Sequence, residues 1–292
     1  MRIVAGILTA LLIAAPAAAQ DGAARAQPEI IVRPPPTEAE RKRELREFAR
    51  DVIRPPRMDD PVAKFFFPVC VKVLGLAPED AEVVAERIRE NADALGVGAD
   101  RASGCVPSVR VAFMAPAAGP AERWLNSESP QLAHLAAYQR ERVLGEAGPV
   151  RAWNKVAVRD FLGQPIRAGE TLWLDPPPQN RTDPIVTTEI TGAAVLIARE
   201  AAHGFTLGQL ADYITMRALL GTGAPEGAAP APTILTLFDD AAPPAGLTAF
   251  DRALVRELYN ASRNASPRRV FNDIARAAVA AEPSDMRENA AP

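Results

Sequence analysis

Two cysteines, Cys70 and Cys105, constrain the fold of this chain more than any other feature. Cys70 lies within an alternating apolar run at residues 69–73, and Cys105 comes just before a second run at residues 109–113. Alternation of this kind predicts a strand with one buried face. A disulfide between the two cysteines therefore predicts that the strands are neighbours. Closing a loop of about 35 residues stabilises a fold by roughly 3–4 kcal/mol on the chain-entropy model.

The segment between the two predicted strands has the signature of a helix. Pro78 suits the first helical position, and Glu79 and Asp80 in the same turn complement the helix dipole. Gly96 is typical of the residue that follows a helix end. The apolar face carries Val83, Val84, Ile88, Ala92 and Leu95.

Residues 1–19 indicate where the protein works. Arg2 is followed by an apolar run over residues 3–15 and by three alanines at 17–19, the pattern of a secretory signal peptide. The alternative is a retained membrane anchor, but the run is shorter than the roughly 20 residues that cross a bilayer. We therefore expect a secreted or periplasmic protein without stable membrane insertion after signal removal. An oxidising compartment favours a Cys70–Cys105 disulfide; the alternative is a catalytic Cys, which needs an electropositive site.

Composition excludes some classes of partner. The chain has 33 basic and 36 acidic residues, a formal net charge of −3. A nucleic-acid-binding protein is expected to carry a basic excess, so we expect no nucleic-acid partner. The composition does not indicate what the partners are, and no cofactor is expected.

The remaining chain divides into a leader, a body and a tail. Residues 20–36 are Pro-rich and predict a flexible leader. Residues 37–60 predict a surface helix, which Thr37 and Glu40 begin as a capping box, followed by a linker. Residues 61–281 predict a single globular domain, and residues 282–292 a disordered tail.

Within the body, further strands and helices are expected. Residues 150–158 alternate as a third strand, and residues 193–198 form an apolar run that suits a central strand buried on both faces. Residues 121–144 predict helix interrupted at Pro130, residues 172–174 a short strand or irregular loop, and residues 233–238 a short strand or turn. Two capping boxes begin later helices, at Thr206 with Gln209 and at Thr248 with Asp251. The fold class is therefore α+β or α/β, with one mixed sheet and a helix-rich C-terminal third.

Few residues are candidates for binding a metal or a ligand. Glu200 and His203 are an incomplete zinc-ligand set, because a catalytic zinc takes three protein ligands. Asp212, Asp239 or Asp240 is a candidate third. The favoured interpretation of Glu200 and His203 is structural, so no metal site is predicted. Asp239 and Asp240 follow the 233–238 segment, in a loop position where binding residues collect, and are the predicted binding residues.

The last third carries a resemblance. It contains Phe238-Asp239-Asp240 and Leu247-Thr248-Ala249-Phe250-Asp251-Arg252. The mature chain is similar to uncharacterised secreted proteins of alphaproteobacteria, and this third is similar to exported proteins with a zincin-like fold. The helix that carries H-E-x-x-H in a metalloprotease reads Leu207-Gly208-Gln209-Leu210-Ala211 here, without His or Glu. The resemblance therefore implies a fold rather than an activity.

These observations predict an exported, non-catalytic binding or interaction protein. The alternative is a secreted hydrolase with a divergent zincin-like site that involves Glu200 and His203. That alternative rests on fold-level analogy.

Overall fold

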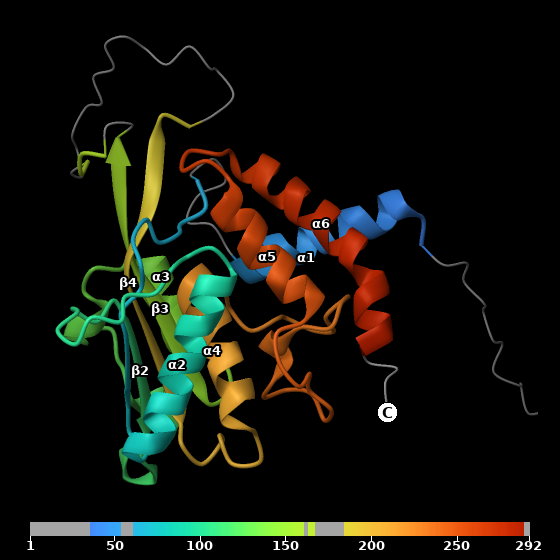
Figure 1. Ribbon diagram of the computed structural model, residues 1–292. Helices are drawn as coiled ribbons and strands as arrows, with labels where there is room; N and C mark the ends of the chain where they lie inside the picture. Colours follow the sequence, from blue (N-terminus) through green and yellow to red (C-terminus); the bar gives the residue numbers. More distant parts are fainter. Residues whose placement is uncertain (1–35, 54–60, 161–162, 167–183, 289–292) are drawn as a thin grey trace, which may run out of the picture. The chain divides into compact units, whose positions relative to one another are not determined.

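A computed structural model describes residues 36–53, 61–160, 163–166 and 184–288 (Figure 1). The predicted signal peptide at 1–19, the leader up to residue 35 and the segment at 172–174 lie outside these residues. The described residues form α1 (Glu38–Ile53), β1 (Val71–Leu74), α2 (Pro78–Ala94), β2 (Val109–Met114), η1 (Pro116–Ala118), η2 (Ala121–Arg123), η3 (Pro130–Leu132), α3 (Ala137–Leu144), β3 (Val150–Asp160), β4 (Val186–Ala198), α4 (Leu207–Leu220), η4 (Ile234–Thr236), α5 (Ala249–Asn260) and α6 (Pro267–Glu288), where η marks a 3₁₀ turn.

The four strands form one mixed sheet in the order β1-β2-β4-β3. β1, β2 and β4 run parallel, and β3 runs antiparallel to β4. The register places Val71 beside Val109, Val109 beside Ala193, and Ala194 beside Trp153. The predicted neighbours around the cysteines are thus parallel strands joined by α2. One mixed sheet with several helices confirms the predicted fold class.

The capping boxes predicted at the starts of three helices are confirmed by their hydrogen bonds. Thr206 Oγ1 accepts from the Gln209 N–H at 3.1 Å, and Gln209 Oε1 accepts from the Thr206 N–H at 3.1 Å. The same reciprocal arrangement begins α1 and α5, where it satisfies N–H groups that have no partner within the helix. At the end of α2, Gly96 has φ +83°, a conformation that glycine adopts without strain.

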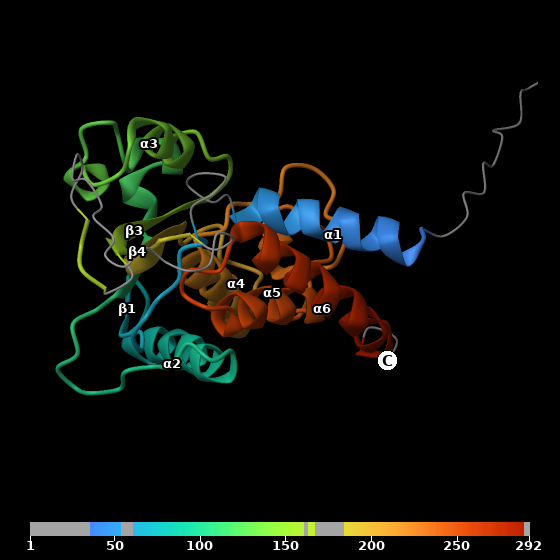
Figure 2. The same ribbon diagram turned by 90° about the horizontal axis from the view of Figure 1, so that it is seen from above.

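The two faces of the sheet are covered differently. α2 and α4 cover one face, where Val111, Val195, Ile88 and Ile214 are fully buried in the main core. The other face carries α3 and the 3₁₀ turns over β3 and β4 only (Figure 2). Its small second core joins Leu132 and neighbouring apolar side chains to Trp153 and Leu196.

α1, α5 and α6 pack together, with α1 lying along α6 in both views (Figures 1 and 2). The disordered tail predicted from residue 282 is wrong at its start, because α6 continues to Glu288. Arg41 of α1 donates through Nε to Glu282 at 2.5 Å. This long-range contact with α1 supports the last turns of α6, and the local sequence gave no sign of it.

Three segments have a different secondary structure from the one predicted. Residues 233–238 contain the 3₁₀ turn η4 rather than a strand. Residues 121–144 contain two 3₁₀ turns, η2 and η3, joined by irregular chain before the short helix α3. The strand predicted at 193–198 begins earlier, at Val186. Within 193–198 only alternate residues are fully buried, so one face of this segment is covered more completely than the other. The reason is that α3 and the 3₁₀ segment cover its other face incompletely.

No helix in the described part of the chain combines the length and the apolar character that crossing a membrane requires.

Candidate functional site

The disulfide predicted between Cys70 and Cys105 is present. The two Cα atoms lie 6.0 Å apart, and the Cys70 carbonyl accepts from the Val109 N–H at 2.9 Å. The bridge therefore joins the residue before β1 to the loop that leads into β2. Both sulfurs are consumed in this bond, so the catalytic-cysteine alternative is wrong for this structure.

Glu200 and His203 lie in the exposed turn that follows β4. The contact between them is a backbone one, from the His203 N–H to the Glu200 carbonyl at 3.2 Å. Within the described ranges, no three or more His, Cys, Asp or Glu side chains are grouped so as to hold a metal ion. Glu200 and His203 therefore gain no third ligand there.

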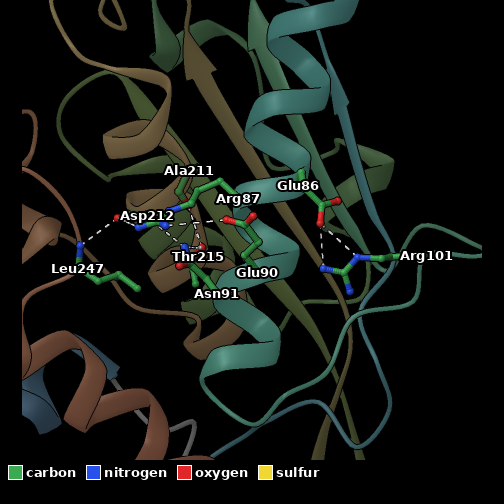
Figure 3. A network of polar contacts seen from close by, with 9 residues as sticks. All are labelled: Glu86, Arg87, Glu90, Asn91, Arg101, Ala211, Asp212, Thr215 and Leu247. Carbon is green, nitrogen blue, oxygen red and sulfur yellow. Dashed lines mark hydrogen bonds and ion pairs between the residues drawn. The ribbon is translucent and has the colours of Figure 1, made fainter.

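Asp212, a candidate third ligand, is instead committed to a structural network on α4 (Figure 3). Its side chain is 1% exposed. It accepts from Arg87 at 2.8 and 3.1 Å and from Asn91 at 2.7 Å, both on α2. It also accepts from the Leu247 N–H at 3.0 Å, and Asn91 donates further to Thr215 at 3.0 Å. Asp212 thus ties α2, α4 and the loop before α5 together.

Asp239 and Asp240 are exposed, lie at the end of the turn that follows η4, and line a hollow between loops. Residues 227–233 and 239–248 line a cavity of about 850 Å³. Residues 221–227 and the end of α3 line a second cavity of about 670 Å³. Gly227, Thr236 and Asp239 belong to both linings, so the two cavities are neighbours and Asp239 borders both. We call the two cavities together the loop hollow.

Part of the loop hollow is formed by a buried ion pair that the sequence did not single out. Arg217 on α4 is 1% exposed and lines the second cavity. It donates to Glu146 at 2.6 Å and to the Tyr213 hydroxyl at 2.5 Å. Burial raises the pKa of Tyr213, so its hydroxyl stays protonated at neutral pH. A usable signal existed: Arg217 stands in an otherwise apolar stretch of helix, where a charge needs a buried partner.

The walls of the loop hollow are held in place by hydrogen bonds to the carbonyls of their prolines. Pro230 accepts from Arg41 at 2.8 Å, Pro232 from the Thr248 hydroxyl at 2.8 Å, and Pro244 from Gln209 at 2.9 Å. Proline also restricts the backbone by fixing φ. Binding to such walls costs little ordering of the chain, which favours affinity.

The loop hollow is acidic. Its lining includes five carboxylates against two guanidinium groups, a formal excess of three negative charges: Glu141, Glu146, Glu226, Asp239 and Asp240 against Arg142 and Arg217. Arg217 is neutralised by Glu146, so the field over the hollow comes mainly from the other carboxylates. The hollow therefore favours a positively charged group.

No protein-family model, curated protein or solved structure matches the chain. The resemblance of its last third to zincin-like exported proteins accordingly stays a prediction from the sequence.

Proposed function

We propose that this chain is an exported, non-catalytic binding protein that holds a small organic cation in the loop hollow. The observation that carries the proposal is the position of Asp239, an exposed carboxylate that borders two neighbouring cavities. An ammonium or guanidinium group donates charge-assisted hydrogen bonds to a carboxylate, and these are stronger than neutral ones.

The size and shape of the loop hollow support an elongated ligand. Cavities of about 850 and 670 Å³ each lie within the range of small-molecule sites. Because Asp239 borders both cavities, a chain-like amine that extends from one to the other places a charged nitrogen near this carboxylate. Spermidine, a linear trication, is a suitable probe.

Isothermal titration with spermidine at low ionic strength tests the proposal. Asp239→Asn is expected to weaken binding about tenfold, because it removes one charge-assisted hydrogen bond. Glu47→Gln is the matched control, since Glu47 is an exposed carboxylate on α1 outside the lining of the loop hollow. It is expected to leave the affinity within about twofold. 1,6-Hexanediol, which lacks the charges, is expected not to bind.

Two results contradict the cation site. One is the lack of saturable spermidine binding by the native protein. The other is equal weakening in Asp239→Asn and Glu47→Gln, which indicates general attraction to an acidic protein rather than a site.

Export is supported by the pattern of residues 1–19 together with the disulfide, a bond that persists in oxidising compartments. Expression of the full chain in a Gram-negative host is expected to give periplasmic protein whose intact mass corresponds to a start near residue 20. Full-length protein retained in the cytoplasm contradicts export.

The alternative hydrolase with Glu200 and His203 gains no support from the described geometry. Both side chains lie in an exposed turn, and Asp212 is committed elsewhere.

A further inference from the structure

The sheet has a second hollow, on the face opposite to α2 and α4. The register sets Arg110 of β2 beside Ala194 of β4, and Ala194 beside Trp153 of β3. Gly192, two residues before Ala194 on the same face, lies beside Lys155 of β3. Small residues on the central strand thus lie between larger side chains on the two strands beside it.

This arrangement leaves a cavity of about 630 Å³ over β4. Gly192 and Ala194 form its floor, because a glycine has no side chain and the alanine methyl is too small to fill the space above the strand. Further along the same face, Leu196 lies under the small second core, which closes that end. The segment around η3 contributes one wall with Gln131 and His134, and Phe67 and residues 106–108 contribute another part of the lining. We call this the sheet hollow.

The sheet hollow is basic, in contrast to the chain as a whole. Its lining contains Arg110, Lys155 and His134 and no carboxylate side chain. Burial lowers the pKa of His134, with a further contribution from Lys155, so the imidazole is neutral at neutral pH. The positive charge of the hollow therefore comes from Arg110 and Lys155. Lys72 extends it at the rim, since it lies beside Arg110 on the neighbouring strand.

These cations have no carboxylate partner in the described part of the chain. Arg110, Lys155 and Lys72 are exposed, and their side chains make no ion pair with another described residue. Other arginines of the described chain are bound to carboxylates, among them Arg87, Arg159 and Arg217. Unpaired cations that converge on one cavity are positioned to receive a ligand anion, and a guanidinium offers it two parallel donors.

The sheet hollow also has an aromatic wall. Trp153 is half-buried, lines the cavity, and lies in the register row that contains Arg110. An indole presents a large flat surface to a planar ligand. Cations on both sides of a small-residue floor, together with this ring, match a molecule with one anionic group and one ring.

We propose that the sheet hollow is a binding site for a small organic anion, an aromatic ring that carries a phosphate or carboxylate group. Arg110 and Lys155 hold the anionic group, and the ring lies against Trp153. This site is distinct from the loop hollow: the two linings share no residue, and the charges have opposite sign.

Titration calorimetry with phenyl phosphate at low ionic strength tests the proposal. Arg110→Gln and Lys155→Gln are each expected to weaken binding about tenfold. Arg256→Gln removes an exposed charge from α5, away from the sheet hollow, and is expected to change the affinity by less than twofold. Trp153→Leu is expected to reduce phenyl phosphate affinity to that of inorganic phosphate. Phenylacetate in place of phenyl phosphate distinguishes a carboxylate ligand from a phosphate ligand.

Three results overturn the proposal. They are the absence of saturable binding of both phenyl phosphate and phenylacetate to the native protein, equal weakening by Arg256→Gln and Arg110→Gln, and inorganic phosphate binding as tightly as phenyl phosphate. Because Arg110 and Lys155 are exposed, their variants are expected to keep the native unfolding temperature, which excludes misfolding as the cause of lost binding. Spermidine binding is expected to persist in them, so failure here is separable from failure of the loop hollow.

Discussion

Single buried residues hold distant elements together in this protein. Lys64 is 5% exposed, and its ammonium donates to the carbonyls of Leu258, Tyr259 and Ala261 at 2.9, 3.3 and 2.5 Å. These carbonyls lie at the end of α5, where a helix lacks internal donors for its last C=O groups. Lys64 therefore serves as a long-range cap for α5.

The titration of Lys64 predicts how stability changes with pH. Burial, with the nearby positive charge of Arg263, lowers the pKa of Lys64 to about 8. An unfolded lysine keeps its proton up to about pH 10.4. Between these values the unfolded chain binds more protons than the folded one, so stability rises with pH through this window.

Urea unfolding at pH 7 and pH 9.5 measures this effect, with Lys64→Met as the reference that does not titrate. The native protein is expected to gain stability relative to Lys64→Met as the pH rises. A difference that is constant or falls contradicts the assignment.

At the scale of elements, the disulfide acts on a strand–helix–strand unit. It joins two positions 35 residues apart and fixes how the chain enters β1 and β2. The double variant Cys70→Ser, Cys105→Ser is expected to lose about 3–4 kcal/mol of unfolding free energy, because the unfolded chain regains the freedom of the loop.

Denaturant unfolding of that variant, and of native protein under reducing conditions, should give matching losses. Ser103→Ala, an exposed change in the same loop, is expected to have an effect below about 0.5 kcal/mol. Equal stability of the native protein and the double variant, or free thiols in the native protein, argues against a structural bond.

At the scale of the whole described unit, α1 and α6 lie far apart in the sequence and side by side in the structure (Figure 2). Leu45 of α1 is fully buried and belongs to the main core. α1 is therefore part of the fold rather than an appendage to it.

Leu45→Ala tests this placement. It is expected to lower the unfolding free energy by about 2–4 kcal/mol, through lost apolar burial and the cavity left behind. Glu47→Gln on the exposed side of α1 is expected to change it by less than about 0.5 kcal/mol. A loss below about 1 kcal/mol in thermal or urea unfolding of Leu45→Ala means that α1 packs only loosely in solution.

The candidate sites combine residues with local sequence signals and residues that only the fold brings together. Asp239 could be found because it follows an apolar segment, and its loop position is a local property. Arg110 and Trp153 could not be recognised as partners, because they meet only through the register of β4 between them. Asp212 was open to a metal role until Arg87 and Asn91, more than 100 residues earlier in the chain, proved to occupy its carboxylate.

The sequence alone determined the local features: the capping boxes, the alternation in β1 and β2, the glycine after α2 and the pairing of two cysteines. The first three depend on the conformational preferences of a few adjacent residues. The disulfide could be predicted because two cysteines allow only one intramolecular pairing. Only the tertiary structure decided the strand order, the packing of α1 on α6 and the two hollows of opposite charge. These depend on which apolar faces meet, and several faces of similar hydrophobicity were equally suited to burial until the whole chain packed.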